Sequence, residues 1–135
     1  IFEHLKTNNV KLGIITDGYK ETQKQKIDSL CLKDIIDEIV ITDELGKQYW
    51  KPHKLPFEVI VKKMSIDFDE MIYVGDNPTK DFYIGSIYPI RTVRILREGY
   101  YLDKEYFKGI KENYRITTLS ELLNIIKAIN RMEGE

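Results

Sequence analysis

The stretch MIYVGDNPTKD, residues 71–81, decides the fold. It opens with a short apolar run over residues 71–75, built from residue types common in strands, and turns polar at Asp76. A run that is apolar throughout is typical of a strand covered on both faces, as the strands of a parallel sheet are. We therefore predict a buried parallel strand whose carboxyl end carries a carboxylate.

The rest of the chain repeats this pattern and alternates it with helical segments. A second apolar run, VKLGIIT over residues 10–16, is followed by Asp17-Gly18. Further strands are expected over 38–42, 91–96 and 115–119, and helices over 1–9, 20–31, 55–64, 80–87 and 120–131. This alternation predicts an α/β fold, a Rossmann-like three-layer doubly wound parallel sheet of about five strands, with residues 1–135 as a single domain.

Two details of the helices follow from residue type and spacing. The helix over 55–64 carries an apolar stripe at helical spacing, and the last helix is expected to begin at a Ser120 cap. The stripe consists of Phe57, Ile60, Val61 and Met64.

Composition and charge exclude several functions. Lys and Arg total 21 and Asp and Glu total 22, so the net charge of −1 gives no electrostatic basis for binding nucleic acid or an anionic membrane. No apolar run approaches the roughly 18 residues of a membrane span. The single cysteine, Cys31, rules out an internal disulfide and is expected to be buried. This cysteine usage fits a cytoplasmic protein.

The carboxyl ends of the expected strands gather groups that suit phosphate chemistry, because ligands of such sheets bind beyond those ends. A hydroxyl and backbone N–H groups, as at Thr16-Asp17-Gly18, can bind phosphoryl oxygens. A lysine such as Lys51, in the loop after the second strand, can neutralise their charge. Taken singly, Thr16 could equally cap a turn and Lys51 could be an ordinary solvated lysine.

Two carboxylates follow the strand over 71–75. Asp76 comes directly after Gly75, and Asp81 lies five residues further on. Mg²⁺ is a hard cation that prefers oxygen ligands, so Asp76 and Asp81 are candidate metal ligands. Each of them could instead cap a helix, since Asp suits a helix start.

Together these segments resemble the haloacid dehalogenase superfamily. LGIITDG resembles the second motif of that family, WKPHKLPF the third and MIYVGDNPTKD the fourth, and their order and spacing match. The resemblance covers about residues 1–127. It implies that Thr16, Asp17 and Gly18 bind the phosphate of the substrate, through the Thr16 hydroxyl and the N–H groups after it, and that Thr16 and Lys51 are also the catalytic residues.

The resemblance also implies a reaction. Lys51 would neutralise the phosphate and the nucleophile, Asp76 would bind Mg²⁺, and Asp81 would support or share that metal. The family's usual reaction is Mg²⁺-dependent hydrolysis of a phosphate ester through an aspartyl-phosphate. The expected substrate is a small phosphorylated metabolite, and neither its identity nor the oligomeric state follows from the sequence.

One departure from the family pattern concerns its first motif, Asp-x-Asp-x-Thr, which supplies the nucleophile. No such motif precedes Thr16, and the pair Asp67 and Asp69 precedes a strand instead of following one. We expect either a truncated phosphohydrolase core that is inactive alone, or an inactive phosphate- or Mg²⁺-binding or protein-interaction module. A signalling receiver domain fits poorly, because its lysine would follow the fifth strand whereas Lys51 follows the second.

The missing motif also bears on strand order. A sheet that lacks the strand before that motif would leave unpaired backbone groups at its centre, unless the first and third strands of this chain became neighbours or another chain filled the gap. We therefore expect the order 2-1-3-4-5, the other common doubly wound arrangement.

Overall fold

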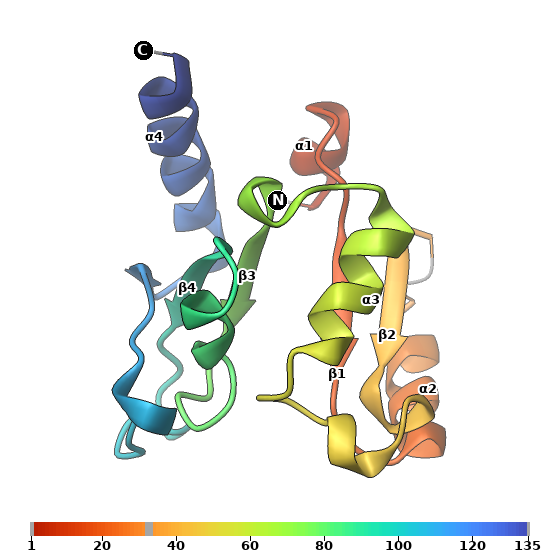
Figure 1. Ribbon diagram of the computed structural model, residues 1–135. Coiled ribbons are helices and arrows are strands. Elements are labelled where there is room, and N and C mark those ends of the chain that lie inside the picture. The colour runs from red at the N-terminus through yellow and green to blue at the C-terminus, as the bar shows by residue number, and fades with distance from the viewer. Residues whose placement is uncertain (1, 32–33, 135) are drawn as a thin grey trace. The chain divides into compact units, whose positions relative to one another are not determined.

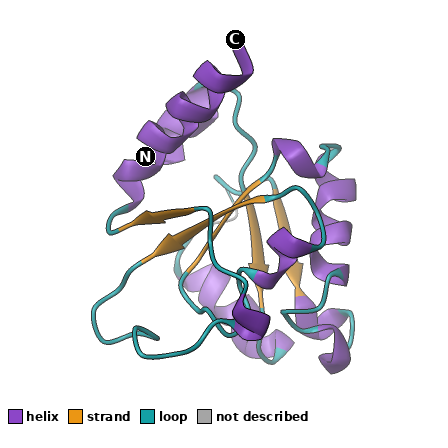
Figure 2. Cartoon of the chain, turned by 60° about the vertical axis from the view of Figure 1, so that its left-hand side comes forward, coloured by secondary structure: helices purple, strands orange, loops and turns teal. Residues whose placement is uncertain are grey.

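The structure is a computed structural model that describes residues 2–31 and 34–134. The chain divides into two compact units, Ile1–Met71 and Ile72–Glu135. Each unit contains a parallel sheet and at least one helix (Figures 1 and 2), so the predicted α/β class is confirmed. No helix in the described part of the chain is both long and apolar enough to cross a membrane.

The first unit is built on two parallel strands. β1 pairs with β2 in a register that places Gly13 opposite Glu38 and Thr16 opposite Ile41. Its helices and strands are α1 (Phe2–Thr7), β1 (Gly13–Thr16), α2 (Lys20–Ser29), β2 (Glu38–Ile41) and α3 (Leu55–Met64). Three short 3-10 turns complete the unit: η1 (Thr42–Glu44), η2 (Lys47–Tyr49) and η3 (Phe68–Glu70).

Helix α3 covers the β1–β2 pair. All four residues of its predicted stripe are buried, and Phe57 is fully so. A Cβ at Gly13 would lie 2.7 Å from Ile60 Cδ1, so the glycine allows α3 to approach β1 closely. Pro56 in the first turn of α3 suits a helix start, because the missing N–H would have no partner there.

The second unit is a three-stranded parallel sheet in the order β3-β4-β5. Its elements are β3 (Ile72–Gly75), η4 (Tyr83–Ser86), β4 (Arg91–Ile95), η5 (Phe107–Gly109), β5 (Tyr114–Ile116), η6 (Leu119–Glu121) and α4 (Leu122–Gly134). Val93, Ile116 and Leu122 form its core, against which half-buried residues of the strands and of α4 pack. This packing fixes α4 against the sheet of its own unit.

Three pairs of the expected order 2-1-3-4-5 are confirmed: β1 pairs with β2, β3 with β4, and β4 with β5. The expected pairing of β1 with β3 stays a prediction. Ile14, Ile72 and Val74 are half-buried. The single domain expected over residues 1–135 stays a prediction.

Three local expectations are corrected. The helix expected over 80–87 is the short 3-10 turn η4. Cys31 is exposed with a positive φ of 53°, because α2 ends at Ser29. The cap before α4 is Thr118, not Ser120, because Thr118 and Glu121 form a capping box. Backbone N–H groups of Thr118 and then Thr117 hold the pKa of Glu121 below its usual value.

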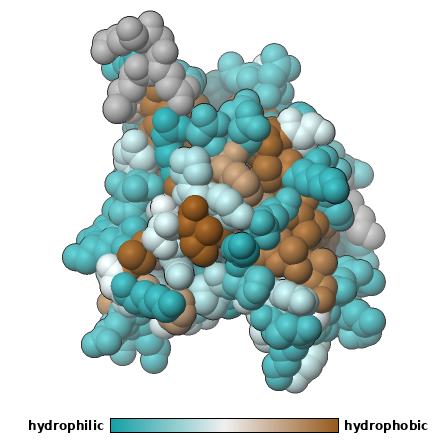
Figure 3. Space-filling view, in the orientation of Figure 1, coloured by the Kyte–Doolittle hydropathy of each residue, from teal (hydrophilic) through white to brown (hydrophobic). Residues whose placement is uncertain are grey.

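Among the described residues, exposed large apolar side chains are concentrated between residues 100 and 107. On the face shown in Figure 3, hydrophilic residues predominate, and hydrophobic ones gather where α3 lies in the view. Of the large apolar side chains recorded as exposed, four lie between residues 100 and 107. They are Tyr100, Tyr101, Leu102 and Phe107.

An ion pair ties α1 to the strand ends. Lys6 Nζ donates to Asp37 Oδ1 at 2.6 Å and the Leu12 backbone N–H donates to Asp37 Oδ2 at 2.6 Å. The Lys6 hydrogen bond first, and then the Leu12 N–H, lower the pKa of Asp37 below its usual 3.8. The stabilisation is therefore complete above that usual pKa and is lost as the pH falls through the lower folded pKa.

We predict that Asp37→Asn lowers the free energy of unfolding at neutral pH by about 0.5 kcal/mol, the scale of a partly exposed ion pair. The difference from wild type should shrink in acid below the folded pKa of Asp37. Urea unfolding at neutral pH and at a pH below the folded pKa of Asp37 measures this difference in stability. Asp34→Asn, at an exposed position, is the control. Equal stability of wild type and Asp37→Asn at neutral pH would contradict the assignment.

Candidate functional site

The turn after β1 is shaped by a glycine and a buried glutamine. Thr16, the last residue of β1, donates its hydroxyl to Gln23 Oε1 on α2 at 2.7 Å. Gly18 has a φ of 115°, and a Cβ there would collide with the Gln23 amide. A side chain at position 18 would therefore meet both backbone strain and a clash, so the turn requires glycine.

The carboxylate of Asp17 joins three segments of the first unit. Asp17 Oδ1 accepts the hydroxyl of Thr42 at 2.7 Å and the backbone N–H of Lys51 at 3.1 Å. Thr42 is fully buried at the end of β2. Asp17 thus fixes the end of β1 to the end of β2 and to the loop that carries Lys51.

Two further contacts hold this region together. Asp43 Oδ2 accepts the backbone N–H of Lys20, the first residue of α2, at 2.9 Å. The Tyr19 and Trp50 rings meet edge to face with centroids 6.2 Å apart. The loop before Lys51 therefore packs against the turn after Gly18.

The loop after β3 is organised around Asp81. Asp81 Oδ2 accepts the backbone N–H groups of Asp76 at 3.1 Å and Asn77 at 2.9 Å, and Asp81 Oδ1 accepts the Tyr73 hydroxyl at 3.3 Å. The Asp81 residue is 3% exposed. A Cβ at Gly75 would lie 2.6 Å from the Asp81 carboxyl group, so only glycine leaves room for it.

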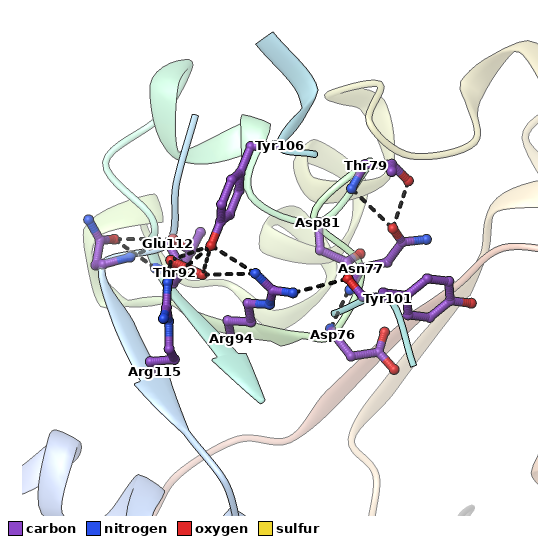
Figure 4. Close-up of polar contacts among 11 residues, drawn as sticks. Asp76, Asn77, Thr79, Asp81, Thr92, Arg94, Tyr101, Tyr106, Glu112 and Arg115 are labelled. Carbon is purple, nitrogen blue, oxygen red and sulfur yellow. Dashed lines mark hydrogen bonds and ion pairs between the residues drawn. The ribbon is translucent and has the colours of Figure 1, made fainter. Parts of the chain in front are cut away.

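The Asn77 side chain completes this loop. Asn77 Oδ1 accepts the backbone N–H of Thr79 at 3.0 Å and its hydroxyl at 2.7 Å. Figure 4 shows Asp76 beside this loop, with its carboxyl group directed away from Asp81. The side chain of Asp76 is 27% exposed and its Oδ2 lies 3.7 Å from Arg97 Nη1.

The donor set in this loop fits a hard divalent cation. Asp76 offers a partly exposed carboxylate, whereas the carboxylate of Asp81 already accepts two backbone N–H groups and a hydroxyl. Mg²⁺ is commonly bound through one or two carboxylates, with waters and substrate phosphate as its other ligands. Asp76 can therefore be a direct ligand, and Asp81 can hold Asp76 in place.

A second acidic group lies elsewhere. Asp67, Asp69 and Glu70 bring exposed carboxylate oxygens within 4.8 Å of one another. Asp69 and Glu70 belong to η3, Asp67 is the residue before it and forms a capping box with Glu70, and all three precede β3 in the chain. Their positions fit helix capping, and they do not follow a strand as Asp76 does.

The structure places the six predicted residues in two sets. Thr16, Asp17, Gly18 and the backbone of Lys51 lie together in the first unit, and Asp76 and Asp81 lie together in the second. The sequence analysis missed the residues that position them. These are Gln23, Thr42, Tyr73 and Asn77.

A further missed residue is Arg94, a buried charge on β4. Its Nη1 donates to the Tyr106 hydroxyl at 2.8 Å, and that hydroxyl donates to the Glu112 carboxylate at 2.6 Å (Figure 4). The signal was visible in RTVRIL, because a charged residue inside an apolar strand needs a partner when it is buried.

Comparison with known proteins finds a hydrolase family and several phosphatases that are similar to this chain. The family described as haloacid dehalogenase-like hydrolase matches residues 1–95. A glyceraldehyde 3-phosphate phosphatase of Methanocaldococcus jannaschii is 35% identical over 127 residues, which are 94% of this chain and 54% of that protein. A pyrophosphatase of Bacillus mycoides is 26% identical, over 95% of this chain and 57% of its own length.

Solved structures agree with these sequence matches. A HAD phosphatase from Thermococcus onnurineus superposes with a TM-score of 0.78 at 30% identity, over 93% of this chain and 54% of its own. The chain thus spans about half the length of the curated relatives it matches.

We predict stability effects of different size for the two aspartates of the β3 loop. Asp81→Asn should lower the free energy of unfolding by about 1–3 kcal/mol, because it leaves buried backbone donors poorly paired. Asp76→Asn, at a partly exposed carboxylate, should change it by less than about 0.5 kcal/mol. Urea unfolding without divalent cations measures both, and equal effects would refute the division of roles.

We also predict that the Thr42 hydroxyl stabilises the first unit. Thr42→Val keeps the shape but removes a donor to Asp17, which should cost about 1–2 kcal/mol. Thr22→Val, at an exposed position on α2, is the matched control and should cost far less. If the two variants unfolded at the same urea concentration, Asp17 would not depend on Thr42.

Proposed function

Because the chain belongs to the haloacid dehalogenase-like hydrolase family, we propose that it is the core of a Mg²⁺-dependent phosphohydrolase acting on a small phosphorylated metabolite. The observation that carries the proposal is the β3 loop, in which buried Asp81 fixes the backbone of Asp76 and leaves the Asp76 carboxylate partly exposed. Phosphatases among the relatives support it.

The first unit supplies the proposed phosphate-binding residues. The Thr16 hydroxyl and the backbone N–H groups that follow it bind phosphoryl oxygens, and Gly18 lets the chain turn sharply there. Lys51 neutralises the charge on those oxygens. Asp17 has a positioning role, because its Oδ1 accepts hydrogen bonds from Thr42 and Lys51.

The second unit supplies the proposed metal ligands. Asp76 would hold Mg²⁺ directly, and Asp81 would keep the loop in the shape that presents Asp76. When bound, Mg²⁺ offsets negative charge on a transferring phosphoryl group. In this proposal the aspartyl-phosphate forms on an Asp-x-Asp segment outside these 135 residues, and the chain alone is inactive.

A second candidate function uses the same residues without turnover. Within the sequence, the Asp-x-Asp pair at Asp67 and Asp69 precedes β3 instead of following a strand. Phosphate or Mg²⁺ binding by Thr16, Lys51 and Asp76 needs no nucleophile. A binding or protein-interaction module therefore remains the alternative to an enzyme core.

The relatives suggest the substrate class. They include phosphatases of glyceraldehyde 3-phosphate and a pyrimidine 5'-nucleotidase of Escherichia coli, which act on small phosphorylated compounds. We extend that class to this chain. We also propose a cytoplasmic location, because the sequence has one cysteine and so no internal disulfide.

The proposal is tested by hydrolysis of a generic phosphate ester. The chain alone should be inactive, whereas a fusion that places a strand, an Asp-x-Asp-x-Thr motif and a cap ahead of residue 1 should be active with Mg²⁺. In the fusion, Lys51→Ala should lower kcat by about 100-fold or more. Lys54→Ala, an exposed lysine of the same loop, is the control and should keep nearly full activity.

Three other outcomes decide against the proposal. Activity of the chain alone would mean that one of its own carboxylates is the nucleophile. An inactive fusion that still binds phosphate would favour the binding module. Full activity of the fusion after chelation of divalent cations would exclude the metal role of Asp76.

A further inference from the structure

The turn after β4 places the positive charge of Arg97 beside the carboxylate of Asp76. Arg97 Nη1 lies 3.7 Å from Asp76 Oδ2, and the Arg97 guanidinium lies 4.7 Å from the centroid of the Tyr100 ring. A backbone bridge joins Arg97 to Tyr100, and Gly99 between them has a φ of 80°. The tight turn therefore holds the cation and the ring next to each other.

The segment that carries this turn is fixed to its own unit. Arg94 Nη2 donates to the Tyr101 carbonyl at 3.2 Å and Arg94 Nη1 donates to the Tyr106 hydroxyl at 2.8 Å. The Phe107 N–H donates to the carbonyl of Pro78, in the loop after β3, at 3.0 Å. These bonds hold the segment over the end of β4 and limit how far Arg97 can move.

The carboxylate of Glu112 also helps to hold this segment in place. Glu112 has a side chain that is 5% exposed, and it accepts the Tyr106 hydroxyl at 2.6 Å. The Tyr106 hydroxyl and the charge of Glu112 raise the pKa of the Arg115 guanidinium above its usual value. Glu112 Oε1 lies 3.9 Å from Arg94 Nη1 and balances its buried charge, whereas Arg97 pairs with Asp76.

Arg97 and a divalent cation would compete for the same carboxylate. Both are positive, and each gains from contact with the oxygens of Asp76, so binding of one weakens binding of the other. The Arg97 side chain is 55% exposed, so its ion pair is of the weak, salt-sensitive kind. A cation with two charges can displace it at modest cost.

We propose that Arg97 is the resident counter-ion of Asp76 and that it sets the affinity of the proposed metal site by competing with the divalent cation. The proposal rests on the assignment of Asp76 as a metal ligand made above. In the metal-free protein Arg97 neutralises Asp76, and cation binding requires its guanidinium to leave the carboxylate. The competition keeps the site weaker than its carboxylate alone would make it.

The test is a Mg²⁺ titration of the chain followed by the backbone amide NMR signals of Asp76 and Asn77. Arg97→Gln removes the competing charge and should tighten Mg²⁺ binding about two- to fivefold, the range expected from an exposed ion pair. Lys104→Gln removes an equal charge from an exposed position of the same segment and is the matched control. It should change the affinity much less.

Two further readouts separate competition from a general charge effect. Arg97→Lys keeps the charge and should stay close to wild type. Added NaCl should reduce the difference between Arg97→Gln and wild type, because it screens the ion pair.

The outcomes distinguish this inference from the proposed function. Binding that shifts the Asp76 signal with equal affinity in wild type and Arg97→Gln would overturn the role of Arg97 alone. An equal gain in Arg97→Gln and Lys104→Gln would also overturn it. Absence of any shift at Asp76 in both wild type and Arg97→Gln would overturn the proposed metal site itself, and the inference with it.

Discussion

The carboxylate of Asp81 accepts the backbone N–H groups of Asp76 and Asn77, and the loop after β3 depends on that interaction. Parallel strands end in N–H and carbonyl groups that need partners as the chain leaves the sheet. A buried carboxylate satisfies two donors at once and leaves the neighbouring Asp76 partly exposed. Gly75 is part of the same arrangement, because any side chain there would occupy the space of the Asp81 carboxyl group.

In the first unit, a carboxylate likewise pairs with polar groups at the end of a strand. Asp17 accepts a hydroxyl and a backbone N–H at the end of β1, and Gly18 follows with a positive φ. In both units one carboxylate fixes the loop beside a residue that we propose binds a ligand, Thr16 in the first unit and Asp76 in the second. In this proposal, position along the turn, more than residue type, separates the aspartates that shape the loops from the one that binds.

The strands and the α3 stripe could be predicted from the sequence, because apolar runs and the residues that end them are local features. The six candidate site residues stay predictions. The expected pairs β1–β2, β3–β4 and β4–β5 are observed, and the pairing of β1 with β3 stays a prediction. β1 and β3 look alike in sequence, and which strand lies beside each depends on backbone groups far away in the chain. The helix expected over 80–87 was wrong, since Asp81 bonds back to residues 76 and 77 instead of starting a helix there.

The supporting residues were harder to find for a related reason. Thr42 and Gln23 are ordinary polar residues in the sequence, and only their burial beside Asp17 and Thr16 gives them a role. Arg94 is the one supporting residue named here that the sequence itself marks, because a charge inside an apolar strand needs a partner when it is buried. Tyr106 and Glu112, which supply it, lie 12 and 18 residues further along the chain, beyond the reach of a local pattern.

We propose that Asp76, positioned by Asp81, holds a divalent cation. A crystal structure of the protein grown with Mn²⁺, with anomalous scattering recorded, tests it most directly. The account predicts one strong anomalous peak about 2.1 Å from a carboxylate oxygen of Asp76, with Arg97 moved off that carboxylate. A peak at Asp67, Asp69 and Glu70 with none at Asp76 would contradict it.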